Sequence, residues 1–187
     1  MDIRLSVKGI LLLSLASVVF YSCSVKQRSI ANNLYEQRGY LLQEFKNKSI
    51  IRSRGKNIIM LSYYQNGNVN QFFFKKEKQD FFLSRDTLQY PVNQISSLSG
   101  VDMSDSSKYK EAMCKEISIL LRKMDTLQIR DISAEFLSVG IDMKIYFGEN
   151  GALLYISNPD LIKNKRWKDY VTNATRYDSN WYYAKDE

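Results

Sequence analysis

Apolar side chains recur every three or four residues in three segments of the chain, which predicts three helices. The first spans residues 25–46, the second spans residues 107–124 with Ser106 or Ser107 as its N-cap, and the third follows Asn158-Pro159. Proline suits the first helical position because that position needs no backbone donor. The apolar stripes are Ile30, Leu34, Leu41 and Phe45, then Met113, Ile117, Leu120, Leu121 and Met124, then Trp167, Tyr170, Val171 and Ala174.

Alternation of apolar and polar residues predicts antiparallel strands between these helices. Residues 57–75 and 141–156 each form an expected hairpin, turned by Asn66-Gly67 and Asn150-Gly151. An Asn-Gly pair between two strand-like runs is a strong hairpin signal, because its turn needs positive φ. Further strands are expected around residues 81–83, within residues 127–138 and at residues 181–183.

Runs of strands between few helices indicate an α+β fold rather than a parallel sheet. We predict one antiparallel sheet of about six strands, built on the two Asn-Gly hairpins, with about three helices. Each half of the chain has a helix followed by such a hairpin, so a weak αββ duplication with the helices on one face is one interpretation. Chance similarity of two amphipathic hairpins is the other. The expected core contains Leu34, Phe45, Met60, Phe73, Met113, Ile117, Leu121, Met143, Ile145, Phe147 and Leu154.

The first 22 residues differ from the rest of the chain. Arg4 and Lys8 precede an apolar run that reaches Tyr21, and Ser22-Cys23 follows directly. A basic start, a short apolar segment and a small residue are typical of a secretory signal, and the run is shorter than the roughly 20 residues of a membrane-spanning helix. A signal that ends on Cys resembles that of bacterial lipoproteins, and the relaxed box with Ser before the Cys is similar to those of Bacteroidota lipoproteins.

This resemblance implies that residues 1–22 are a lipoprotein signal peptide and that Cys23 becomes the acylated first residue of a single α+β domain, residues 23–187. The residues after Cys23 include no acid before Glu36, and Ser24 stands where some inner-membrane lipoproteins have Asp. By the same resemblance, we expect a lipid-anchored protein of the cell envelope, on the outer membrane and facing the periplasm. The alternative is an uncleaved anchor with an incidental Cys.

Positive charge is concentrated near the predicted anchor. The chain has 27 Lys and Arg against 20 Asp and Glu, and the excess is densest in Lys46, Lys48, Arg52, Arg54 and Lys56. Basic residues beside a lipid anchor gain about 1 kcal/mol each from anionic headgroups, which makes this segment a candidate membrane-proximal patch. A solvated loop is the alternative. We expect no nucleic-acid partner despite the high pI, because an envelope location removes it.

The chain contains no His, which excludes Ser-His-Asp and Cys-His catalysis and His-containing metal sites. With Cys23 acylated, Cys114 has no disulfide partner and a Cys-based metal site is excluded as well. The sequence also has no Gly-rich phosphate loop and no nucleophile elbow. We therefore expect no catalytic residue, no metal and no cofactor.

Three functions are compatible with this composition. The first is a non-catalytic envelope lipoprotein that binds a protein partner or supports an envelope assembly. The second is recognition of peptidoglycan or another glycan by aromatic rings near the C-terminus, which would otherwise fill the core. The third is a carboxylate-dependent hydrolase that uses Glu135 or Asp142, two acids expected on the outward face of neighbouring strands. The aromatic group consists of Trp167, Tyr170, Trp181, Tyr182 and Tyr183.

Overall fold

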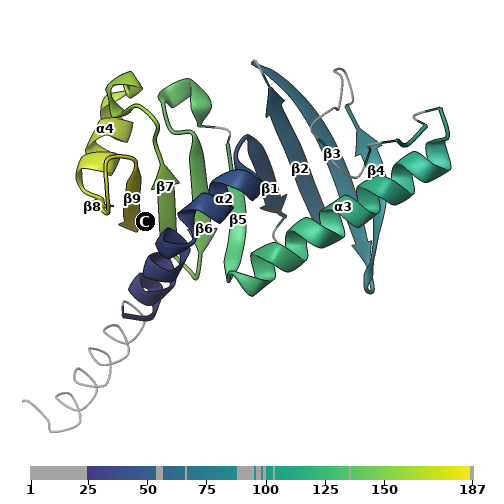
Figure 1. Cartoon of the computed structure of the whole chain (residues 1–187), viewed down its shortest axis with the longest axis horizontal. Helices are drawn as coiled ribbons and strands as arrows, with labels where there is room; N and C mark the ends of the chain where they lie inside the picture. Colours follow the sequence, from purple (N-terminus) through teal and green to yellow (C-terminus); the bar gives the residue numbers. More distant parts are fainter. Residues whose placement is uncertain are drawn as a thin grey trace, which may run out of the picture.

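The computed structural model describes residues 25–185 apart from residues 54–56, 66, 88–94, 96–97, 99, 103 and 135. Within this part, the chain forms four helices and a single open antiparallel sheet of nine strands (Figure 1). The strand order is β4-β3-β2-β1-β5-β6-β7-β9-β8. The α+β class and the single antiparallel sheet are confirmed, but the expected six strands and three helices are too few. The predicted anchor Cys23 and the predicted signal peptide, residues 1–22, lie outside the described residues.

The elements follow one another along the chain with short connections. A helical segment over residues 25–36 leads into α2 (Arg38–Phe45), and β1 (Lys48–Arg52), β2 (Ile58–Gln65), β3 (Asn68–Glu77) and β4 (Asp80–Asp86) follow. The second half contains α3 (Ser106–Thr126), β5 (Ile129–Ser133), β6 (Met143–Phe147), β7 (Gly151–Tyr155), α4 (Lys165–Thr172), β8 (Thr175–Arg176) and β9 (Trp181–Lys185). The short strands β1 and β8 carry too little alternation to be predicted from the sequence alone.

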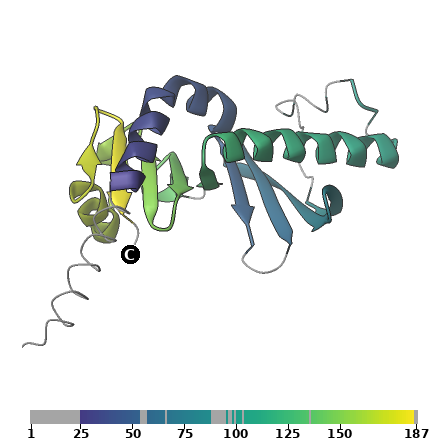
Figure 2. The same ribbon diagram turned by 90° about the horizontal axis from the view of Figure 1, so that it is seen from below.

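The helices cover the two faces of the sheet unequally. Residues 25–36 and α2 lie over the β5–β7 half, and α3 crosses β2, β3 and β4 on the same face (Figures 1 and 2). The helix α4 lies on the opposite face, beside β7 and β9 (Figure 2). The two helices of the αββ interpretation therefore share one face, and α4, which is not part of that interpretation, covers the other. The periodicity of a helix shows which of its sides is apolar but not which face of a sheet it covers.

The apolar core is divided by the sheet into two clusters. The larger cluster lies under the first helices and α3, and the smaller one lies under α4. Successive residues of β7 show the division, because Leu153 belongs to the larger cluster and Leu154 to the smaller. The expected core residues that are buried are Leu34, Phe45, Met113, Ile117, Leu121, Met143, Ile145, Phe147 and Leu154.

Met60 and Phe73, which the sequence placed in the core, point to the other face of the first hairpin. They pair with each other across β2 and β3 and are only half-buried. Their neighbours Leu61, Phe72 and Phe74 are fully buried against α3 instead. Both strands are apolar at consecutive positions, so the sequence does not show which alternate set faces the core, and a one-residue shift reverses the assignment.

Three boundaries differ from the sequence-based expectations. The N-cap of α3 is Asp105, whose side chain accepts hydrogen bonds from the backbone N–H groups of Ser107 and Lys108, each 3.1 Å away. Asn158-Pro159 begins only a short 3₁₀ turn, and α4 starts later, capped by Asn164. The strand expected within residues 127–138 ends at Ser133, so Phe136 lies beyond β5.

The two adjacent rings of β3 provide a test of which face is buried. We expect Phe74→Ala to lower the free energy of unfolding by about 3–5 kcal/mol, because it leaves a cavity in the core. Phe73→Ala should cost less than about half as much, since that ring already contacts water. Urea unfolding followed by circular dichroism measures both. Equal losses would contradict the assigned face.

Candidate functional site

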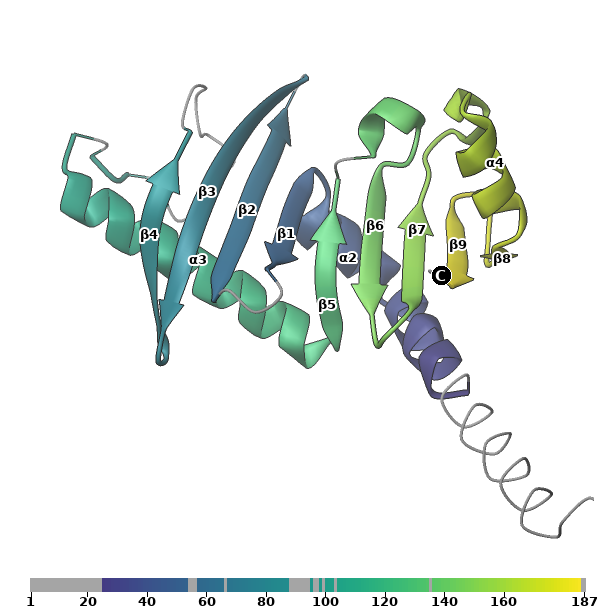
Figure 3. The ribbon, with the colours of Figure 1, turned by 180° about the vertical axis from the view of Figure 1, so that it is seen from behind.

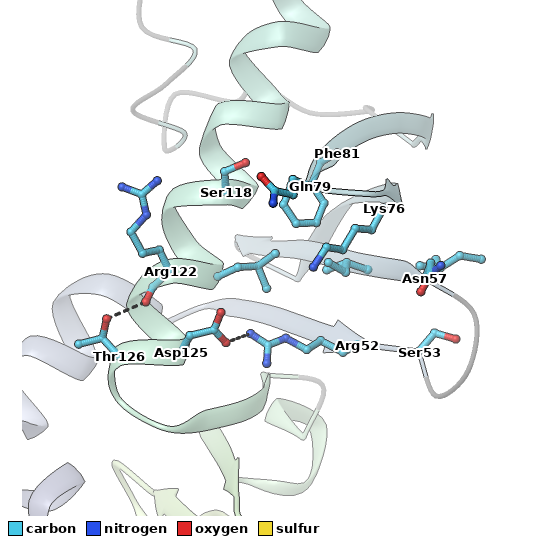
Figure 4. Close-up of a pocket in the computed structure, with 13 residues that line it drawn as sticks. Arg52, Ser53, Asn57, Lys76, Gln79, Phe81, Ser118, Arg122, Asp125 and Thr126 are labelled. Atoms are coloured by element: carbon cyan, nitrogen blue, oxygen red, sulfur yellow. Dashed lines mark hydrogen bonds and ion pairs between the residues drawn. The ribbon is translucent and has the colours of Figure 1, made fainter.

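A cavity of about 770 Å³ lies between α3 and the adjoining ends of β1, β2 and β3 (Figure 4). We call it the α3 groove. Its described lining includes the basic residues Arg52, Lys76 and Arg122, and Asp125 is the acidic residue among them. The described walls of the α3 groove therefore carry a net positive charge.

Ion pairing and orientation distinguish these basic residues. Arg52 Nη2 lies 2.6 Å from Asp125 Oδ1, which joins the end of β1 to the last turn of α3. Lys76 extends from β3 toward α3, with its Nζ 5.8 Å from the centroid of the Phe81 ring (Figure 4). The Arg122 side chain points away from both of them (Figure 4). The acidic residue of the described lining, Asp125, is therefore paired with Arg52.

The described members of the predicted basic patch do not lie at one place. Lys48 is half-buried at the start of β1, where its Nζ donates to the Glu44 carbonyl at 2.6 Å and burial lowers its pKa. Arg52 lies at the other end of β1, in the α3 groove. Lys46 is exposed at the end of α2, whereas Arg54 and Lys56 lie outside the described residues.

The C-terminal aromatic group is divided between core and surface. Trp181, Tyr182 and Tyr183 form most of β9 and are only 2%, 6% and 7% exposed. The alternative that they fill the core therefore holds for these three side chains. Trp167 and Tyr170 lie on α4 and are half-buried.

A second cavity, of about 570 Å³, lies beside α4, and Lys144, Trp167, Asp169, Tyr170 and Asn173 are among its lining residues. We call it the α4 cavity. The Trp167 and Tyr170 rings pack edge to face with their centroids 5.5 Å apart. Lys144 Nζ lies 4.8 Å from the centroid of the Tyr170 ring. Lys144 is only 5% exposed, because α4 and its aromatic rings cover its face of β6.

No described helix covers the second face of β1–β4 (Figure 3). The strand registers place on it a set of apolar side chains that the sequence analysis missed. Ile51, Met60 and Phe73 are cross-strand partners in a row, and Val69 and Phe82 lie on the same face. We call these five residues the open face. Phe82 is 50% exposed and the others are half-buried. The sequence contained evidence for this second apolar surface, because β2 and β3 carry apolar residues at consecutive positions and therefore on both faces.

A buried polar pair lies between α3 and the sheet. The Tyr63 hydroxyl donates to Glu116 Oε1 at 3.0 Å, and these side chains are only 5% and 7% exposed. Burial, followed by the nearby Glu116 carboxylate, raises the pKa of Tyr63 above its usual range. Neither residue lines the α3 groove or the α4 cavity. We therefore assign this pair a structural role.

The structure describes only one of the two carboxylates of the hydrolase alternative. Asp142 Oδ2 accepts a hydrogen bond from the backbone N–H of Ser157 at 2.6 Å, and Glu135 lies outside the described residues. Within the part of the chain that the structure describes, no three Cys, Asp or Glu side chains gather into a metal-binding group. In that same part, no helix is both long enough and apolar enough to cross a membrane.

Comparison with known proteins identifies no relative of this chain. No protein-family model matches it, and neither the curated proteins nor the solved structures include a similar chain. The chemistry of the α3 groove, the α4 cavity and the open face therefore supplies the functional argument.

We expect Tyr63→Phe to lower the free energy of unfolding by about 2 kcal/mol, because the buried Glu116 carboxylate loses its donor. The raised pKa of Tyr63 means that its contribution is complete below pH 10, its ordinary pKa, and is lost as the pH rises further. Urea unfolding at pH 8 and above pH 10 measures both effects. Tyr40→Phe, at an exposed position of α2, is the matched control. A loss that is equal in the two variants would contradict the assignment.

Proposed function

We propose that this chain is a non-catalytic envelope lipoprotein, acylated at Cys23, that binds a protein partner through the open face. The observation that carries this proposal is the apolar surface on β1–β4, which no described helix covers (Figure 3). Contiguous exposed apolar side chains on a soluble domain typically mark a surface that contacts another protein. A partner bound there would make the chain part of an envelope assembly.

The shape and the borders of the open face favour a protein over a small molecule. Small ligands bind in concave pockets, whereas a sheet face offers a broad surface. Lys75 and Arg85 lie on the same face as Phe73 and Phe82, so charged groups border the apolar row. An apolar centre with a polar rim is the usual composition of a protein interface.

The first helical segment supports a domain held close to its anchor. It is described from residue 25, two positions after Cys23, and its buried residues Ala31 and Leu34 belong to the larger core cluster. The Tyr35 ring stacks on Tyr177 with centroids 4.6 Å apart, and its hydroxyl donates to Asp178 at 3.0 Å. Acyl chains on Cys23 would therefore hold the domain near a bilayer, and we propose that this bilayer is the outer membrane, with the domain facing the periplasm.

Site-specific photo-crosslinking in intact cells tests this function. We expect a photoreactive phenylalanine analogue at position 82 to give a discrete adduct with one envelope protein, because Phe82 is half-exposed on the open face. The same analogue at Ile119, a 38% exposed residue on α3, is the matched control and should give no such adduct. Phe73→Asp should abolish the adduct at position 82 by placing a charge in the apolar row.

The adduct should also depend on the anchor and be lost in Cys23→Ala. Adducts of equal intensity at positions 82 and 119, or an adduct that persists in Phe73→Asp, would contradict binding at the open face. A crosslink between two copies of the chain would replace the proposed partner with a homodimer.

Glycan recognition is the second candidate, supported by the two half-buried rings of the α4 cavity. Trp167 and Tyr170 line it together with Asp169 and Asn173, so stacking surfaces and hydrogen-bonding groups are adjacent. We expect cell-wall fragments to change the Trp167 fluorescence while buried Trp181 gives a constant signal. Trp167→Phe should remove the response. An unchanged spectrum across a panel of cell-wall and polysaccharide fragments would rule out this candidate.

We also propose that the two halves of the sheet derive from a duplicated unit. In the first half a helix precedes four consecutive strands and in the second half a helix precedes three, and β1 and β5 meet at the centre of the strand order. The sequences of the two units have little identity, so the support comes from the order of the elements.

A further inference from the structure

We propose that the α3 groove binds the phosphate group of a ligand whose remaining part carries hydroxyl groups. Lys76 is the primary contact with the phosphate, and Arg52 supplies additional donors. Both side chains line the groove, from β3 and β1 respectively. This site lies on the helix-covered face of the sheet and is independent of the open face.

Lys76 is a cation of the groove that extends toward α3 and forms no ion pair among the described residues (Figure 4). Among the described residues, no carboxylate lies within 4.0 Å of its ammonium group, whereas Lys75 pairs with Glu77 at 2.6 Å and Lys123 pairs with Glu44. Lys75 and Lys76 are consecutive on β3 and therefore point to opposite faces. The register agrees, because Lys76 pairs with Phe81 and Lys75 with Phe82. Of these two lysines, Lys76 lines the groove and Lys75 does not.

Arg52 is held in position by its carboxylate partner. The bond to Asp125 uses Nη2, and a guanidinium group has five N–H donors in a planar fork. The remaining donors can bind phosphate oxygens in the geometry that Arg suits best. The backbone N–H of Arg52 also donates to Asp131 Oδ1 at 2.9 Å, which fixes the end of β1.

Neutral groups around these cations suit a hydroxylated ligand. Gln79 and Ser118 lie on the side of the groove away from Arg52 (Figure 4). Lys76 lies between Arg52 and these two residues (Figure 4). Phe81 and Leu121 add apolar surface on which a sugar or glycerol carbon skeleton can rest. The volume of about 770 Å³ lies within the range of pockets that hold small ligands.

A soluble sugar phosphate and a phospholipid headgroup share this chemistry, and calorimetry on the full chain in a neutral detergent distinguishes them. Glucose 6-phosphate is titrated against glucose, and dihexanoyl phosphatidic acid is titrated against dihexanoylglycerol. We expect binding by at least one phosphorylated probe, weakening with added salt, and none by the phosphate-free compounds. A preference for the sugar phosphate indicates a soluble ligand, and a preference for the phosphatidic acid indicates a lipid headgroup.

Two neighbouring variants locate the site. Lys76→Met keeps the length of the side chain and should raise the Kd about tenfold, the usual effect of losing one charged hydrogen bond. Lys75→Met, on the opposite face of the same strand, should leave the Kd within about twofold. Urea unfolding checks that both variants remain folded. Absence of binding by both phosphorylated probes, equal binding of glucose, or equal effects of the two variants would overturn the proposal.

Discussion

The pairing of β1 with β5 is the contact on which the continuity of the sheet depends. It joins strands from the two halves of the chain, and Ile50 and Ile132 are its register partners, both fully buried. Side chains strengthen the join, because Ser49 Oγ accepts a hydrogen bond from the backbone N–H of Ala134 at 2.8 Å, and Asp131 accepts one from Arg52. These bonds satisfy backbone donors beyond the short ladder.

The same join determines where the helices lie and where the α3 groove forms. Lys123 on α3 donates to the Glu44 carboxylate on α2 at 2.5 Å, so a salt bridge links the two helices that cover the paired strands β1 and β5. The Arg52–Asp125 pair links the end of α3 to β1 on the same side. The half-exposed pairs add little stability individually, but they fix the register of α3 against the strands. The α3 groove lies where the last turn of α3 meets the end of β1, just before the chain enters β5.

The sequence was sufficient for the elements whose pattern is local. Helix α3 and the strand β6 have clear periodicity, and residues such as Met113, Ile117 and Ile145 are buried as expected. The assignment of faces failed where packing depends on distant elements. Phe72, Phe73 and Phe74 are equally apolar, and only the position of α3 decides which of them is buried. Lys144 is buried because α4 covers it, a contact that no local pattern shows.

The alternation of side chains along β3 and β4 separates the two proposed binding surfaces. Lys76 and Phe81 point to the α3 groove, whereas their chain neighbours Lys75 and Phe82 point to the side of the open face. A protein on the open face therefore leaves the groove accessible, because the full thickness of the sheet lies between them. A ligand in the groove contacts the reverse side of the same strands. The two surfaces can be occupied together, and a substitution at one position can alter one surface while its neighbour serves as the control for the other.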